Sequence, residues 1–195
     1  GYAFTHETTW ENIALKYAFL FAEVTESKGK LRFNFPPLKL DHIKELTTDY
    51  GILQFSKFSQ PDLSSGYTLD DNARALIDMV MYYDLNSDPI ALDLATIYLN
   101  FITEIQREDG RFDNYKDSNR QLTKQNELVN LEDSNGRALW SLGFLLSYQK
   151  NLPIDLVQQA QKVWDKAVVH IDGVTSPRAI AYTLKGLYYY YQVNK

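Results

Sequence analysis

Two pairs of neighbouring carboxylates precede apolar segments of similar composition. One pair is Asp70 and Asp71, and the other is Glu132 and Asp133. Paired carboxylates can act as general acid and base, or accept hydrogen bonds from sugar hydroxyls. The alternative is structural, because the helix dipole favours carboxylates in the first turn of a helix. Both interpretations stay open at this point.

Arginines accompany these carboxylates and are the first candidates for ion pairing or ligand binding. Arg74 follows the first pair by one turn and can pair with it on the same helix. Arg137 and Arg178 lie near expected helix starts, where the dipole opposes positive charge. They therefore need carboxylate partners, and Asp133 or Asp71 are the nearest candidates.

A polar loop between two helical segments supplies further candidates. Asp109-Gly110 is typical of a turn, and the alternative is a loop that offers Arg111, Asn114 and Tyr115 to a polar ligand.

Several aromatic side chains also allow both a structural and a ligand-binding interpretation. They could stack on sugar rings, although aromatic residues of inner helices more often belong to the core. They are Tyr67, Trp140 and residues 188–191.

The elements that would position these residues are helices. Apolar residues at helical spacing predict a first helix over 9–24, with a capping box of Thr8 and Glu11, and a short helix near 40–46. Longer helices are expected over 69–84, from Pro89 through Ile105, over 135–148, after Pro153, and from Pro177 to the end. Residues 25–37 are typical of a linker and 51–65 of irregular structure.

The long helices alternate between two kinds. Those at 69–84, 135–148 and 177 onward are apolar nearly all round, whereas the two between them have one apolar face. This predicts an all-α array of αα-hairpins with inner and outer helices, over residues 38–195, after an N-terminal appendage at 1–37. Parallel inner helices would start at one rim and gather the acidic pairs and Arg178 there.

Composition excludes several classes. The chain has 195 residues, no cysteine, and 25 Asp+Glu against 20 Lys+Arg without a basic cluster, which argues against nucleic acid. The three histidines lack ligand spacing, so we expect neither a metal nor a cofactor. No apolar run reaches the roughly 20 residues that span a bilayer, and the lack of cysteine fits the cytoplasm. The chain begins with Gly1, so a targeting segment could have been removed.

The motifs also resemble a known family. Gly66 to Leu76, with Tyr-x-x-Asp-Asp-Asn-Ala-Arg-Ala-Leu as the most specific part, is similar to the helical domain that follows bacterial family 4-type (group 1) glycosyltransferases. The segments 109–112, 132–140 and 176–179 extend this resemblance over about residues 38–195. The hairpins resemble (α/α) six-hairpin glycosidase-like toroids, and Thr9 to Tyr17 is similar to the closing helix of such a transferase.

The resemblance implies that the nucleotide-sugar-binding domains, and with them the transfer chemistry, lie upstream of this chain. It implies a partial toroid, because the chain supplies three inner and two outer helices. An incomplete ring would expose apolar surface along 176–191, which absent hairpins or a second copy in a homo-oligomer would cover.

Three functions remain open from the sequence. The first is an accessory domain that binds a glycan acceptor at the rim. The second is a glycoside hydrolase relative in which Asp70 or Asp71, together with Glu132 or Asp133, acts as acid and base. The third is a scaffold. Solvent-facing Asp71 and Asp133 would favour the first two, and full pairing with Arg74 and Arg137 the third.

Overall fold

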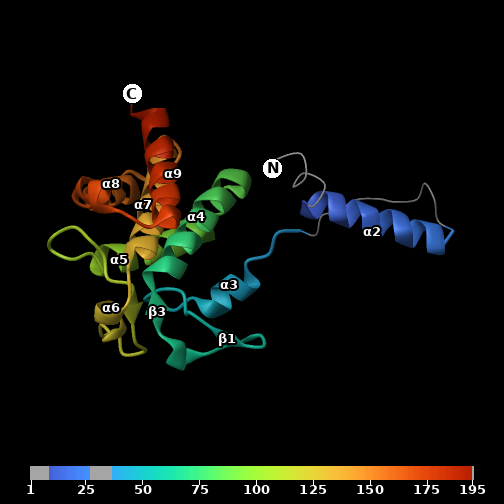
Figure 1. The fold of residues 1–195 in the computed structure, drawn as a ribbon, viewed down its shortest axis with the longest axis horizontal. Helices are drawn as coiled ribbons and strands as arrows, with labels where there is room; N and C mark the ends of the chain where they lie inside the picture. Colours follow the sequence, from blue (N-terminus) through green and yellow to red (C-terminus); the bar gives the residue numbers. More distant parts are fainter. Residues whose placement is uncertain (1–8, 27–36, 195) are drawn as a thin grey trace. The chain divides into compact units, whose positions relative to one another are not determined.

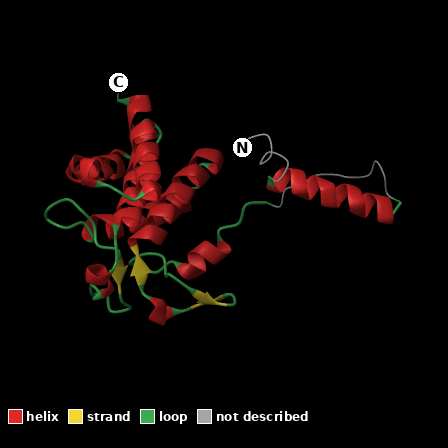
Figure 2. Cartoon of the chain, viewed as in Figure 1, coloured by secondary structure: helices red, strands yellow, loops and turns green. Residues whose placement is uncertain are grey.

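The computed structural model describes residues 9–26 and 37–194, and helices predominate among them (Figure 2). The described chain divides into two units, one ending at Lys39 and the other beginning at Leu40. The helical content confirms the predicted all-α class.

The first unit contains the helix α2, Trp10–Val24. It agrees with the predicted range of 9–24. Thr9 occupies the position before the helix without a side-chain capping bond. Thr8 of the expected capping box, and most of the expected linker, lie outside the described residues.

The second unit contains the remaining helices (Figure 1). Their starts follow from capping chemistry, because the side chains of Thr68, Asp88 and Ser176 accept hydrogen bonds from backbone N–H groups in the first turns of α4, α5 and α9. The helices are α3 (Asp41–Leu46), α4 (Leu69–Asn86), α5 (Pro89–Glu104), α6 (Gln125–Leu128), α7 (Glu132–Ser147), α8 (Ile154–Ala167) and α9 (Pro177–Val193), with 3-10 helices η1 (Leu63–Ser65) and η2 (Val168–Gly173).

Two pairs of short antiparallel strands interrupt the helices. β1 (Ser56–Lys57) pairs with β2 (Gln60–Pro61), within the segment that was predicted to be irregular. β3 (Tyr67–Thr68) pairs with β4 (Tyr115–Lys116), with Thr68 opposite Tyr115. The second pair holds the long loop between α5 and α7 against the start of α4.

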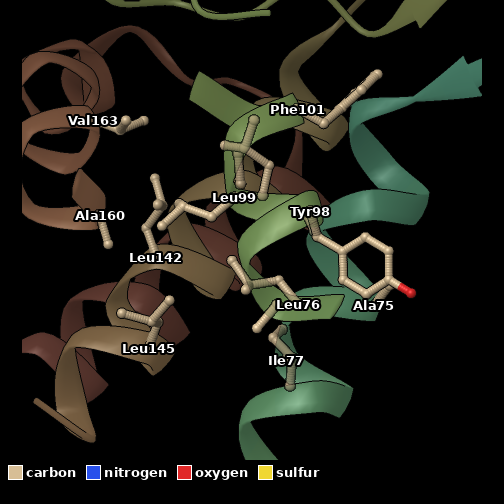
Figure 3. Packing of buried hydrophobic residues seen from close by; sticks show 14 of the residues in the cluster. Ala75, Leu76, Ile77, Tyr98, Leu99, Phe101, Leu142, Leu145, Ala160 and Val163 are labelled. Carbon is tan, nitrogen blue, oxygen red and sulfur yellow. The ribbon is translucent and has the colours of Figure 1, made fainter. Parts of the chain in front are cut away.

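The core lies where four helices meet. α4 packs against α5 and α7, α7 also packs against α8, and α5 touches α8. Figure 3 shows Leu76, Leu99 and Leu142 at this junction, and each of the three is fully buried. Burial of one such leucine contributes roughly 1.5–3 kcal/mol.

α7 and α9 run parallel and touch through their backbones. Gly136 lies opposite Ala179, and Gly143 lies opposite Gly186, where a Cβ atom on Gly143 would be 2.2 Å from the Gly186 carbonyl oxygen. Larger residues at Gly143 would therefore force the helices apart.

α4 is parallel to α7 as well. Asp70 and Arg137 pair at the helix starts, and Asp84 and Tyr148 line one hollow near the opposite ends. The starts of α4, α7 and α9 therefore meet at one side of the unit, as the sequence predicted.

The outer face of α9 is apolar and exposed. Ile180, Leu184, Tyr188 and Tyr191 share this face, with Tyr188 60% exposed. This agrees with the expected apolar edge over 176–191.

No helix within the described residues is long and apolar enough to cross a membrane.

Candidate functional site

The start of α4 is held by bonds within the same helix. The hydroxyl of Thr68 accepts a hydrogen bond from the backbone N–H of Asp71 at 3.1 Å and donates to its Oδ2 at 2.5 Å. Arg74 donates to the other carboxylate oxygen of Asp71. Asp71 is therefore bound to its own helix, which is the structural alternative considered for this pair.

Asp70 points the other way, toward the loop and α7. Its backbone N–H donates to Oδ1 of Asn114 at 3.1 Å, which adds a second cap to α4. Its carboxylate lies 3.2 Å from Arg74 and 2.8 Å from Nε of Arg137. Burial raises the pKa of Asp70, and the two arginines oppose this effect only in part.

Leu131, the residue before α7, provides no side-chain cap, and the acidic residues of the first turn reach toward α9. Glu132 accepts hydrogen bonds from the backbone N–H groups of Ser176 at 2.5 Å and Thr175 at 2.9 Å. These bonds lower the pKa of Glu132, which remains a carboxylate that fixes the chain ahead of α9.

Asp133 completes the link between the two helix starts. It accepts a hydrogen bond from the Ser176 hydroxyl at 2.9 Å and pairs with Arg178. The hydrogen bond to Asp133 raises the pKa of Arg178. Of the two predicted partners of Arg178, Asp133 and Asp71, the structure shows Asp133, which like Asp71 is paired rather than free.

Two predictions about α7 were wrong. The helix begins at Glu132 rather than at residue 135, because Asn130 accepts a hydrogen bond from the Glu132 N–H and extends the ordered backbone. Arg137 contacts Asp70 rather than Asp133 or Asp71. Its Nε–H is not aligned on the carboxylate, so the contact is ionic and that N–H has no acceptor among the described residues.

A hollow of about 230 Å³, which we call the rim pocket, lies between these helix starts. It brings together six of the predicted site residues, from α4, the loop, α7 and α9. Its lining consists of Asp70, Asn114, Tyr115, Asn130, Leu131, Asp133, Ser134, Arg137 and Arg178. Two carboxylates and two guanidinium groups thus share one small, open space.

A second pocket of about 280 Å³ shares Asn130 and Leu131 with the rim pocket. Its lining also includes Arg111, Glu132, His170 and Thr183. Its carboxylate is already bound to the segment before α9, and its neighbour Arg107 is paired with Asp113. The rim pocket contains six of the predicted site residues, whereas this second pocket contains only Arg111 and Glu132, so we centre the candidate site on the rim pocket.

The other predicted residues have structural contacts. Asp109 and Gly110 form the expected turn, with Gly110 at φ +93° and the Asp109 carboxylate accepting from the Arg111 N–H. Tyr67 is buried and its hydroxyl bonds to that of Thr48 at 3.1 Å. The described lining of the two pockets does not include Tyr67, Asp71, Arg74 or Asp109.

Two asparagines bind the backbone of a preceding loop, and the sequence analysis did not identify this shared role. Asn72 accepts from the backbone N–H of Ile52 at 3.0 Å, and Asn135 accepts from that of Phe112 at 2.9 Å. Each also donates to the carbonyl oxygen four residues earlier. The repeated pattern Asn-x-Arg-Ala-Leu was the available signal, because it places both at the same position of the repeat.

An aromatic pair adjoins the rim pocket through Arg137. The guanidinium of Arg137 lies 4.7 Å from the centre of the Tyr182 ring, and this ring is parallel to that of Trp140, with centroids 5.7 Å apart. Both rings are half-buried. Trp140 was a predicted stacking residue, whereas Tyr182 was missed although it follows Arg178 by one turn.

Neither a metal-binding cluster nor a related protein identifies the site. Within residues 9–26 and 37–194, no cluster of three or more histidine, cysteine or acidic side chains could hold a metal ion. No family model matches the chain, and the comparison with curated proteins finds no match. The resemblance to glycosyltransferase helical domains therefore rests on the motif residues alone.

Proposed function

We propose that the helical unit from Leu40 onward is a carbohydrate-binding accessory domain that holds a glycan acceptor at the rim pocket. The observation that supports this most is the continuity of two surfaces. The charged groups of Asp70, Asp133, Arg137 and Arg178 border the pocket, and the half-buried Trp140 and Tyr182 rings follow directly after Arg137.

This combination suits a sugar ring. Sugar hydroxyls both donate and accept hydrogen bonds, so they can bind carboxylates and guanidinium groups side by side. The apolar face of a sugar can contact the exposed parts of the half-buried Trp140 and Tyr182 rings. Because the ion pairs already hold these side chains in place, binding would require little ordering of the protein.

The motif resemblance extends the proposal to the parent protein. In this account α4 with α5, and α7 with α8, are hairpins of a partial (α/α) toroid, and α9 is the inner helix of a third. The parent is a bacterial, cytoplasmic glycosyltransferase whose upstream domains perform the transfer. The exposed apolar face of α9 is where further hairpins or a second copy would pack.

Glycan-array binding tests the proposal directly. We expect the purified chain to bind a defined set of glycans, and Arg178→Gln to weaken that binding about tenfold, equivalent to about 1.4 kcal/mol. Arg178 is 70% exposed, so the variant should fold normally. A matched control is Arg111→Gln, which removes an exposed arginine outside the rim pocket. Absence of binding by the wild-type chain would reject the proposal and favour a scaffold.

A second candidate function is that of a glycoside hydrolase. The raised pKa of Asp70 and its place in the rim pocket favour it. Burial raises its pKa, as a general acid requires, and Asp133 shares the rim pocket with it as a base or nucleophile. Turnover of a bound glycan by the isolated chain, abolished in Asp70→Asn, would select this function. Binding without turnover would select the accessory domain.

A further inference from the structure

Beyond the rim pocket, one face of α7 and one face of α9 form a continuous series of contacts, which we call the α7–α9 strip. Arg137 lies over Tyr182, the Nζ of Lys185 lies 3.3 Å from the centre of the Trp140 ring, and the rings of Phe144 and Tyr189 meet edge to face at 4.9 Å. The strip consists of Asp133, Arg137, Trp140 and Phe144 from α7, and Arg178, Tyr182, Lys185 and Tyr189 from α9.

The strip changes in charge along its length. At the rim pocket, Asp70 and Asp133 neutralise Arg137 and Arg178. Farther along, α9 contains no acidic residue from Pro177 to Val193. Beyond the balanced rim pocket, the strip therefore has one charged side chain, the ammonium of Lys185.

Lys185 is the source of this positive charge. Within the part of the chain that the structure describes, no carboxylate lies within ion-pair distance of its ammonium group. Its position over Trp140 is a cation–π contact, and partial burial lowers the pKa of Lys185. A negatively charged ligand group beside this ammonium would compensate electrostatically for its lost hydration.

We propose that the strip binds an acidic oligosaccharide, whose chain fills the rim pocket with sugar hydroxyls and places a sugar carboxylate against Lys185. This inference rests on the proposed function and names its ligand class. Arg178 and Lys185 are two helical turns apart, about 10 Å along α9, so the ligand is longer than a single sugar ring.

The test is an array in which each uronic-acid oligosaccharide stands beside its carboxyl-reduced form, which carries an alcohol in place of each carboxylate. We expect the wild-type chain to bind the acidic form at least about fivefold more tightly, equivalent to about 1 kcal/mol. Lys185→Gln should lose this preference and Lys185→Arg should keep it. Lys162→Gln, which removes an exposed charge on α8, is the matched control. Added salt should reduce the preference of the wild-type chain.

The outcomes separate this inference from the proposed function. Binding of acidic and reduced forms alike, or an unchanged preference in Lys185→Gln, would overturn the acidic-ligand inference and leave a neutral glycan site. No binding of any glycan by the folded wild-type chain would overturn both. Thermal unfolding of each variant establishes that a lost preference does not come from lost structure.

Discussion

The starts of α4 and α7 have the same sequence pattern, Asp-x-Asn-x-Arg-Ala-Leu, yet their charged side chains have different partners. In α4, Asp70 of this pattern pairs with Arg74 of its own helix and with Arg137 of α7. The next residue, Asp71, binds Arg74 and the capping residue Thr68. In α7, Asp133 binds α9 and Arg137 contacts α4. The α4 start thus combines a cap within its own helix with one contact to α7, whereas the charged pattern residues of the α7 start, Asp133 and Arg137, contact neighbouring helices.

The difference comes from the neighbours of each helix. α7 packs between α4 and α9, so its first turn has a helix start on either side. The shared part of the motif has a shared role, because Asn72 and Asn135 both bind the backbone of a preceding loop. A repeated sequence therefore indicates a repeated backbone arrangement more securely than a repeated site.

The largest effect should follow from separating α7 and α9. Gly143→Ala would place a Cβ atom against the backbone of Gly186, and we expect a loss of about 3 kcal/mol in the free energy of unfolding, well beyond the ~1 kcal/mol gained in helix propensity. Denaturant unfolding measures it. Gly173→Ala is the control, since the added methyl group meets no atom within 4 Å. Wild-type stability in Gly143→Ala would show that the helices are not in backbone contact.

The two asparagines test the shared part of the motif. Asn72→Ala and Asn135→Ala should each cost about 1–3 kcal/mol, because a backbone N–H of a loop loses its acceptor. Asn72 is fully buried, so its substitution should be the more damaging. Chemical denaturation of both variants checks the order, and two negligible losses would remove the common role inferred here.

The two arginines test the part of the motif that differs. Arg137 is 14% exposed and contacts the partly buried Asp70, so Arg137→Met should cost about 1–2 kcal/mol. Arg74 is 48% exposed, and Arg74→Met should cost at most about 1 kcal/mol. Equal losses in thermal unfolding would contradict the distinction between cap and junction.

The smallest effect concerns pH. The raised pKa of Asp70 means that the folded chain holds this proton more tightly than the unfolded chain. The contribution of Asp70 to the free energy of unfolding therefore decreases as pH rises above 3.8, through its folded pKa. Asp70→Asn has no carboxyl group that titrates at this position. The free energy of unfolding of this variant should therefore fall less than that of the wild type as pH rises from 3.8 to neutral. Parallel stability curves for the two proteins would show that Asp70 titrates normally.

The sequence predicted the elements better than their ends. Thr68 and Ser176 placed the starts of α4 and α9 because their side chains cap these helices. α7 has no such residue, and its start was placed three residues late. The two-residue strand β3 was not predictable, because it forms through backbone bonds to Tyr115 and Lys116, far along the chain.

The sequence predicted part of the rim-pocket lining and the pairing of Arg178 with Asp133, but not the partner of Arg137. Parallel inner helices required their starts to meet, which brought Asp70, Asp133 and Arg178 together as expected. The partner of Arg137 lies on another helix, and spacing within one helix cannot reveal it. The parallel rings of Trp140 and Tyr182 depend on the same helix contact.

The most direct test of the account compares Asp133→Ala with Asp71→Ala for glycan binding on an array and for thermal stability. The account predicts that Asp133→Ala loses binding, together with about 1 kcal/mol of stability through the lost contacts to Ser176 and Arg178. It predicts that Asp71→Ala keeps binding and loses about 1 kcal/mol of stability through the weakened cap. Loss of binding in Asp71→Ala with full binding in Asp133→Ala would contradict the assignment of the cap to α4 and of the site to α7.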